Sequence, residues 1–373
     1  MKITCDRILM GSDWKTNQTI TIDNEIITDI SPTTADKDTS AIQVNTLIPG
    51  FIDIQVNGGG GVLFNQTPNA EALHQMFNAH QAYGTTAMLP TLITDCERVM
   101  QQAADAIAEV RSTHPTQFIG IHFEGPWLSQ ARKGVHPPEF IRSPSAAELA
   151  ILKRQDLGLV MVTIAPEHVP TDIIKDMVES GIIVFLGHSA ATYQQVQSAL
   201  DAGASGFTHL FNAMSPLQSR EPGMVGAALA HDGCTAGLIV DGYHVDPVCC
   251  QIAIKTMGIE RIALVTDAMA LAACEANEMP FFDTTIRKEN GKLTTPDGTL
   301  AGSCLTMHDA LLNAQRMCNV SLAQAAYMAS TSPAKALGIE HLQGHIAVGC
   351  HANLVALDDA LAITHVFQQG RPL

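Results

Sequence analysis

Four short apolar runs in the sequence end at residues that bind metal ions or transfer protons: Glu124, His188, His209 and Asp267. One carboxylate and two imidazoles are a common ligand set for a divalent cation such as zinc. A further carboxylate beside the cation suits a general base that takes a proton from water. If the four runs are parallel strands of one closed sheet, their carboxyl ends share a rim, and we expect these side chains to meet there.

Each of these residues also has an ordinary explanation. A single histidine at a strand end is more often structural than functional, and Asp267 could cap the segment that follows it. Glu124 could pair with Arg132 or Lys133. The joint pattern favours a metal site, because core packing alone would seldom place three metal-binding residue types at the ends of three strands.

Further polar residues stand in loops where packing does not require them. His136 and His244 lie in such segments, and we expect both to contact substrate. Arg220 is one of few cations in a chain with a formal charge of −16. It either pairs with Glu221 on the surface or binds a phosphate. The four glycines at 58–61 lack the spacing of a nucleotide-binding loop, and we interpret them as a flexible loop near the site.

Strand-like runs alternate with helix-length amphipathic segments in the middle of the chain. Helices are predicted over residues 70–83, 95–111, 146–154, 172–180, 193–202 and 247–257. Strands are predicted over residues 51–56, 85–89, 118–122, 159–164, 182–186, 207–209, 236–240 and 262–266. Eight parallel strands close a barrel. We prefer a barrel to an open doubly wound sheet, because almost every strand ends in a polar residue, whereas an open sheet collects its ligands at one switch point.

The two ends of the chain predict a second, smaller unit. Residues 1–48 read as short strands broken by turns, and residues 345–373 are strand-like again after a hairpin at 281–295 and helices at 306–317, 322–329 and 333–337. We therefore predict an α/β fold, with a (β/α)8 TIM-like barrel over residues 49–344. A small β-sandwich domain would be built from residues 1–48 and 345–373.

Composition limits the classes of function. A chain of 373 residues that is 46% hydrophobic can bury a large core. Its negative charge, without a basic patch, disfavours nucleic-acid and membrane-surface partners. The nine cysteines show no Cys-x-x-Cys spacing, and we see neither a secretory signal nor a bilayer-length apolar run. We expect a protein of the reducing cytoplasm.

Several motifs together resemble those of the N-acetylglucosamine-6-phosphate deacetylases, a family of the amidohydrolase superfamily. The motifs are FIDIQVNG (51–58), HFEGPWL (122–128), GHS (187–189), THLFNAM (208–214), REPG (220–223), DGYH (241–244), VTDA (265–268) and GCHANL (349–354). The resemblance covers nearly the whole chain. It implies metal-dependent hydrolysis of the acetamide of N-acetyl-D-glucosamine 6-phosphate, in amino-sugar catabolism.

The resemblance also implies roles for individual residues. Glu124, His188 and His209 would hold one divalent ion per subunit, with Zn²⁺ as the first choice and Fe²⁺, Mn²⁺ or Co²⁺ as alternatives. Asp267 would be the acid/base, and His136 would lie against the sugar or the amide carbonyl. Our own hypothesis is that His136 and the metal share the oxyanion charge. The implied substrate contacts are Gln55, Val135, His136, Asn212, Ala213, Arg220, His244, Leu300, Ala301 and Gly302. A homodimer is expected, and Arg220 would serve either its own site or that of the neighbouring subunit.

The chain departs from most amidohydrolases at the end of the first strand, where Asp53 and Gln55 replace the usual His-x-His. Because no imidazole stands there and no lysine ends the fourth strand, we predict a single-metal site. Three alternatives stay open. They are an N-acetylgalactosamine-6-phosphate deacetylase, an amidohydrolase acting on a cyclic amide or nucleobase, and a non-catalytic sugar-phosphate-binding barrel.

Overall fold

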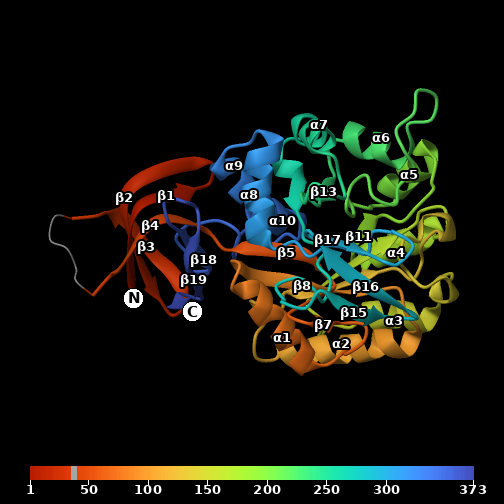
Figure 1. Ribbon diagram of the computed structural model, residues 1–373, viewed down its shortest axis with the longest axis horizontal. Helices are drawn as coiled ribbons and strands as arrows, with labels where there is room; N and C mark the ends of the chain where they lie inside the picture. The colour runs from red at the N-terminus through yellow and green to blue at the C-terminus, as the bar shows by residue number, and fades with distance from the viewer. Residues whose placement is uncertain (35–39) are drawn as a thin grey trace.

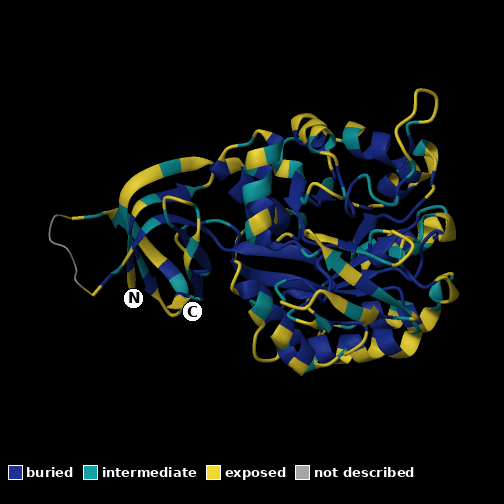
Figure 2. Ribbon diagram, in the orientation of Figure 1, coloured by how far each residue is buried: buried dark blue, intermediate teal, exposed yellow. Residues whose placement is uncertain are grey.

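The computed structural model describes residues 1–34 and 40–373. Figure 1 shows a small β region, coloured red and blue because both chain ends build it, beside a larger α/β body. In Figure 2 most strands inside the larger body are dark blue, while exposed residues lie mainly on its outer helices, its loops and a few small strands in front. The larger body therefore has a buried sheet surrounded by helices. None of the described helices combines the length and apolarity needed to cross a bilayer.

The small β region is one seven-stranded sheet. Its strands are β1 (Lys2–Met10), β2 (Asp13–Asp23), β3 (Ile26–Pro32), β4 (Ile42–Pro49), β18 (Leu354–Leu357), β19 (Ile363–Gln368) and β20 (Arg371–Pro372). Antiparallel pairing of β18 with β4 confirms that the tail joins the N-terminal strands. Ile3, Leu47 and Phe367 belong to one buried cluster, so strands from both ends of the chain share a core. The exact limits of the two domains stay a prediction.

The eight-stranded parallel barrel predicted from the sequence is confirmed. Its strands are β5 (Phe51–Val56), β8 (Thr85–Ile93), β9 (Gly120–Glu124), β10 (Leu159–Ile164), β11 (Ile183–Leu186), β12 (Gly206–Phe207), β13 (Thr235–Leu238) and β14 (Ile262–Leu264). They pair in the order β14-β13-β12-β11-β10-β9-β8-β5. Every residue of β8 is buried, as expected where a parallel sheet is covered on both faces.

The first and last strands of the barrel meet beyond the end of β14. The backbone N–H of Asp267 donates to the carbonyl oxygen of Gln55 at 2.9 Å, and Val56 forms a parallel bridge with Ala268. The Thr266 hydroxyl donates to the buried carboxyl of Asp53. These bonds bring the segment that carries Asp267 against the end of β5.

Helices cover the barrel at most of the predicted positions. They are α1 (Ala70–Gln81), α2 (Glu97–Arg111), α3 (Ala146–Leu152), α4 (Thr171–Glu179), α5 (Tyr193–Asp201), α6 (Gly223–Ala230), α7 (Pro247–Met257), α8 (Met307–Cys318), α9 (Leu322–Ala329) and α10 (Thr331–Ala336). Capping boxes begin α3 at Ser145 and α5 at Thr192. The sequence did not predict α6. Its residues are almost all apolar and mostly buried, so it lacks the alternation that marks an amphipathic helix.

Two small β elements lie over the barrel rim. The predicted hairpin is present as β16 (Thr284–Glu289) and β17 (Lys292–Thr294), with β15 (Glu278–Phe281) added on the other side of β16. The glycine run forms an ordered ribbon of β6 (Gly58–Gly59) and β7 (Val62–Leu63), so the interpretation as a flexible loop is wrong. A Cβ atom on Gly58 would lie 2.4 Å from the carbonyl oxygen of Val62. Close backbone packing therefore explains the glycine there.

Candidate active site

The barrel strands deliver four polar side chains to one rim. Glu124 is the last residue of β9, while His188, His209 and Asp267 follow β11, β12 and β14 within three residues. The last three residues have positive φ angles of 46°, 35° and 50°. Non-glycine residues seldom adopt this conformation, and it persists where the surrounding structure holds it in place, often at functional sites. Each strand end thus turns sharply and directs its side chain towards the barrel mouth.

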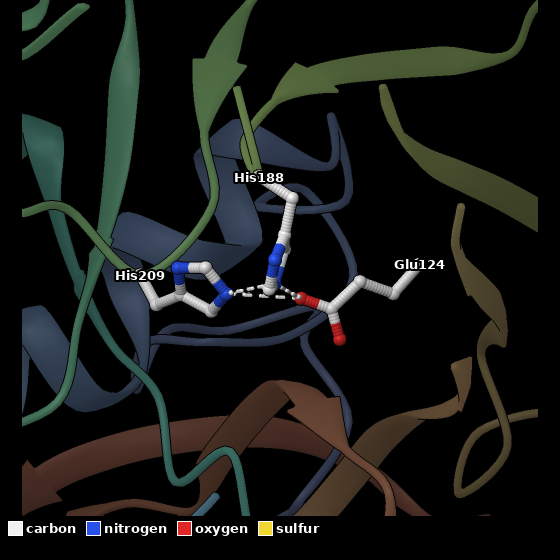
Figure 3. A group of neighbouring side chains, drawn as sticks. All are labelled: Glu124, His188 and His209. Carbon is white, nitrogen blue, oxygen red and sulfur yellow. Dashed lines mark hydrogen bonds and ion pairs between the residues drawn. The ribbon is translucent and has the colours of Figure 1, made fainter. Parts of the chain in front are cut away.

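The predicted convergence of Glu124, His188 and His209 is observed. Glu124 Oε1 lies 3.0 Å from His209 Nε2 and 3.3 Å from His188 Nε2. The two Nε2 atoms are 3.0 Å apart. Figure 3 shows the three side chains pointing towards one another from different strand ends. All three are buried, and their ligand atoms lie within 4.8 Å of one another, so the group could hold a metal ion.

The hydrogen bond of His188 Nδ1 fits a cation at the other ring nitrogen. His188 Nδ1 lies 2.8 Å from the carbonyl oxygen of Arg132, which can only accept, so Nδ1 carries the proton. In the neutral ring the lone pair is then on Nε2, the atom that faces Glu124. One carboxylate and two imidazoles suit zinc and neighbouring divalent metals. The three ligand residues therefore fit the divalent metal ion that the sequence predicted.

Glu124 and the neighbouring His136 both have displaced pKa values. Burial alone would raise the pKa of Glu124, but hydrogen bonds with His188 and His209 outweigh it and hold the pKa well below its usual range. Burial and the neighbouring His188 lower the pKa of His136 well below its usual value. The site therefore contains an ionised carboxylate and a neutral His136 at neutral pH. His136 Nδ1 accepts from the Thr94 backbone N–H, so its other nitrogen carries the proton and can donate.

Asp267 lies beside the metal-binding group and is held by two amides. Its Oδ1 accepts from Asn57 Nδ2 at 2.7 Å and from Gln55 Nε2 at 3.2 Å. The same nitrogen of Gln55 is 3.1 Å from Glu124 Oε1, so this amide joins the two carboxylates. Burial, together with the charge of Glu124, raises the pKa of Asp267 to about 6. The group is mostly ionised at neutral pH and is a stronger base than an ordinary aspartate.

A cavity of about 470 Å³ opens over these residues. It is lined by eleven of the residues named from the sequence: Glu124, Val135, His136, His188, His209, Asn212, Ala213, His244, Asp267, Leu300 and Gly302. Three named residues are not in the lining. Gln55 and Ala301 are buried, and the amide of Gln55 lies behind the lining carboxylates of Glu124 and Asp267, while Arg220 is exposed on the surface.

Arg220 and His244, which both stand in loops, differ in their surroundings. His244 Nδ1 is held 2.6 Å from Asp241 Oδ2. The alternative explanation of Arg220, an ion pair with Glu221, is not observed among the described residues. The Glu221 carboxylate instead accepts from the backbone N–H groups of Tyr193 and Gly223. Arg220 is thus left exposed, while His244 is fixed in the cavity wall.

Seven cavity residues were not named from the sequence: Asn57, Ile93, Gly134, Met269, Lys292, Gly298 and Thr299. Asn57 belongs to one of the motifs that carry the resemblance, so it could have been proposed. Lys292 stands in the hairpin after the last barrel strand and follows a turn. No local pattern distinguishes it from a surface lysine.

Comparison with known proteins gives matches along most of the chain. A model of the amidohydrolase family matches residues 46–373. The N-acetylgalactosamine-6-phosphate deacetylase of Shewanella sp. (strain ANA-3) is 47% identical over 340 residues, which cover 91% of this chain and 86% of the relative. The N-acetylglucosamine-6-phosphate deacetylase of Haemophilus influenzae is 39% identical over 316 residues, which cover 84% of this chain and 82% of the relative.

Solved structures share the fold over its whole length. The N-acetylglucosamine-6-phosphate deacetylase from Pasteurella multocida has a TM-score of 0.95 at 35% identity, with 100% of both chains covered. A Mycobacterium smegmatis N-acetyl-D-glucosamine-6-phosphate deacetylase, in complex with N-acetyl-D-glucosamine-6-phosphate, has a TM-score of 0.92 at 32% identity. The match covers 100% of this chain and 98% of the Mycobacterium smegmatis chain. The similarity therefore includes both the small sheet and the barrel.

Proposed function

The chain belongs to the amidohydrolase family, and from this premise we propose that it hydrolyses the acetamide of N-acetyl-D-glucosamine 6-phosphate to D-glucosamine 6-phosphate and acetate. The observation that carries the proposal is the buried group of Glu124, His188 and His209, with Asp267 in the same cavity. The names of the relatives support this reaction, which belongs to amino-sugar catabolism.

The metal is the cofactor of the proposed reaction. Glu124, His188 and His209 would hold one divalent ion, zinc as the first choice and Fe²⁺, Mn²⁺ or Co²⁺ as alternatives. When bound, the ion would act as a Lewis acid that polarises the acetamide carbonyl and lowers the pKa of water. The single carboxylate and two imidazoles support one ion, because Asp53 and Gln55 offer no imidazole at the end of β5.

Asp267 is proposed as the acid/base of the reaction. Its carboxylate accepts a proton from the attacking water and returns it to the amine nitrogen as the C–N bond breaks. A pKa raised to about 6 suits both tasks, because the carboxylate is ionised at neutral pH and still binds a proton well. The amides of Asn57 and Gln55 hold the oxygen that they contact in place.

His136 is proposed to stabilise the charge that develops on the carbonyl oxygen. Its neutral ring can donate one hydrogen bond into the cavity, because Thr94 occupies its other nitrogen. Such a donor stabilises the charge most strongly in a buried site, because no water is there to make the same hydrogen bond. Around the sugar phosphate we propose contacts from Val135, Asn212, Ala213, His244 and the segment 300–302, and for Gln55 we propose an indirect role through Asp267.

Oligomeric state and location stay proposals. We propose a homodimer, in which the exposed Arg220 would reach the phosphate of either its own or the neighbouring site. Its exposure outside the cavity lining supports the second arrangement. A cytoplasmic location remains a prediction that cell fractionation would test.

A second candidate substrate is N-acetylgalactosamine 6-phosphate. The relative at 47% identity is an N-acetylgalactosamine-6-phosphate deacetylase. This observation favours the galacto epimer as the alternative, since the two sugars differ in the orientation of one hydroxyl group. The proposed phosphate and acetamide contacts would serve both.

One experiment separates these functions. Acetate release is measured from N-acetylglucosamine 6-phosphate, N-acetylgalactosamine 6-phosphate and unphosphorylated N-acetylglucosamine, before and after treatment with a chelator. We expect rapid release from the gluco phosphate, slower release without the phosphate, and none after chelation. A higher rate with the galacto epimer would favour the alternative. Binding of the sugar phosphates without acetate release would indicate a non-catalytic barrel, and release that resists chelation would contradict the metal.

A further inference from the structure

The phosphate of the proposed substrate is an anion, and most of the charged residues that line the cavity are negative or paired. A phosphate monoester carries about 1.5 to 2 negative charges at pH 7. The cavity already contains the carboxylates of Glu124 and Asp267, in a chain whose formal charge is −16. His244 is paired with Asp241, and this pair adds no net positive charge whether or not the imidazole is protonated. Within the cavity lining, an anion therefore needs a cation other than His244.

Among the described residues that line the cavity, Lys292 is the only lysine or arginine. Arg220 lies outside the lining and is exposed. Lys292 itself is exposed, and no hydrogen bond or ion pair ties its ammonium group to another described residue. A charge without a protein partner, at the wall of a cavity that needs one, is available to a ligand.

The hairpin holds Lys292 next to the loop that carries His244. Lys292 is the first residue of β17, and its backbone stands opposite that of Glu289 in the register with β16. The turn between these strands contacts the preceding loop, because the Tyr243 hydroxyl donates to the carbonyl oxygen of Asn290. Gly291 has a φ of 83°, and a Cβ atom there would lie 3.7 Å from the Tyr243 ring. The two cavity residues thus come from segments that are bonded to each other.

Alternation along β17 explains why this lysine faces outward. The next residue, Leu293, is buried in a cluster with Phe281 and Ile286, so Lys292 lies on the opposite side of the strand. The neighbouring Lys288 is already engaged, because its ammonium group donates to the carbonyl oxygens of Leu271 and Cys274. The hairpin therefore uses one lysine to anchor itself and presents the other to the cavity.

We propose that Lys292 binds the phosphate of the substrate and makes the enzyme select phosphorylated over unphosphorylated amino sugars. The inference rests on the proposed function for the identity of the ligand. It holds whether Arg220 acts in its own subunit or in the neighbouring one, since Lys292 belongs to the chain that forms the cavity. An ammonium group is a compact point charge, which suits a phosphate at the end of a flexible C6 arm.

The test compares Lys292→Met with Arg287→Met. Arg287 is a matched control, because it is an exposed cation on the same hairpin, pairs with Glu278 and does not line the cavity. The readout is the ratio of kcat/KM for N-acetylglucosamine 6-phosphate to kcat/KM for N-acetylglucosamine. We expect Lys292→Met to lower this ratio about 10- to 100-fold, mainly through KM, as loss of a charged hydrogen bond would. Arg287→Met should leave it unchanged, and Lys292→Arg should restore most of it.

An equal loss with both sugars, or no loss with the phosphorylated one, would overturn the role of Lys292. A second measurement does not depend on turnover. Calorimetric titration with D-glucosamine 6-phosphate should give a Kd about 10-fold or more weaker for Lys292→Met than for the parent protein. Equal Kd values would refute the inference even for an active enzyme. Conversely, a protein that releases no acetate but loses affinity in the variant would reject the proposed function and retain the phosphate site.

Discussion

The side-chain amide of Asn57 donates a 2.7 Å hydrogen bond to Oδ1 of Asp267. The bond connects the residue that follows β5 with the residue that we propose as the acid/base, and these two positions are 210 residues apart in the sequence. Asn57 is buried and lines the cavity, and its own Oδ1 has no partner among the described residues. The amide is therefore placed to orient the carboxylate.

Replacing Asn57 with Ala should lower kcat while changing KM little. Without the amide, Asp267 would lose one of the two bonds that orient it, and a misplaced base transfers protons poorly. We expect a decrease of about 10- to 100-fold, measured by steady-state acetate release. Metal content and the thermal midpoint are the controls, and an unchanged kcat would show that Asn57 does not position the base.

Replacing Asp267 with Asn should abolish turnover and leave the metal in place. The amide keeps the shape of the side chain but cannot accept the proton, so we expect a loss of at least about 100-fold. Metal analysis of the purified variant should match the parent protein, because Glu124, His188 and His209 are intact. Activity near that of the parent protein would mean that another group is the base.

Removing the metal should affect both activity and stability. A chelator is expected to abolish acetate release and to lower the thermal midpoint, since an ion that binds the folded state stabilises it. Adding Zn²⁺ back should restore both quantities. His209→Asn should bind less metal than His74→Asn, whose histidine lies on α1 and not in the site. Equal metal content in the two variants would exclude His209 as a ligand.

The position of Arg220 can be tested by mixing two inactive variants. If Arg220 serves the neighbouring subunit, a hybrid dimer of Arg220→Ala and Asp267→Asn contains one complete site. Refolding the two variants together should then recover part of the parent activity, which neither variant shows alone. Recovery would indicate the arrangement across the interface. If each arginine serves its own subunit, the mixture stays as inactive as its components.

Asp53 should make stability depend on pH. Its burial raises its pKa to about 7, although the Thr266 hydroxyl and two backbone N–H groups donate to it. The folded state therefore binds the proton more tightly than the unfolded state, and the stability that this contributes is lost as pH rises from about 4 to about 7. Asp53→Asn should remove this loss. In urea unfolding from about pH 5 to about pH 8, we expect the parent protein to lose roughly 2 kcal/mol more than the variant. Parallel pH profiles would contradict the assignment.

The sequence alone determined the barrel and the main side chains at its rim. Apolar runs between amphipathic segments are a local signal, and they predicted eight strands and the residues that end them. Closure then follows from the number of parallel strands, and it requires that their carboxyl ends share one rim. For this reason Glu124, His188, His209 and Asp267 could be brought together before any coordinates were known. The helix α6 had no such signal because it is apolar on all sides.

Only the tertiary structure decided which other side chains support that site and which lie outside it. It gave Gln55 a place between Glu124 and Asp267, brought Lys292 into the cavity and left Arg220 outside it. The position of Lys292 depends on how the hairpin β16–β17 packs against the loop at 241–244. Such packing joins segments far apart in sequence, and its energy comes from contacts that no local period records. A lysine on an exposed strand therefore looks the same in the sequence whether it faces solvent or a substrate.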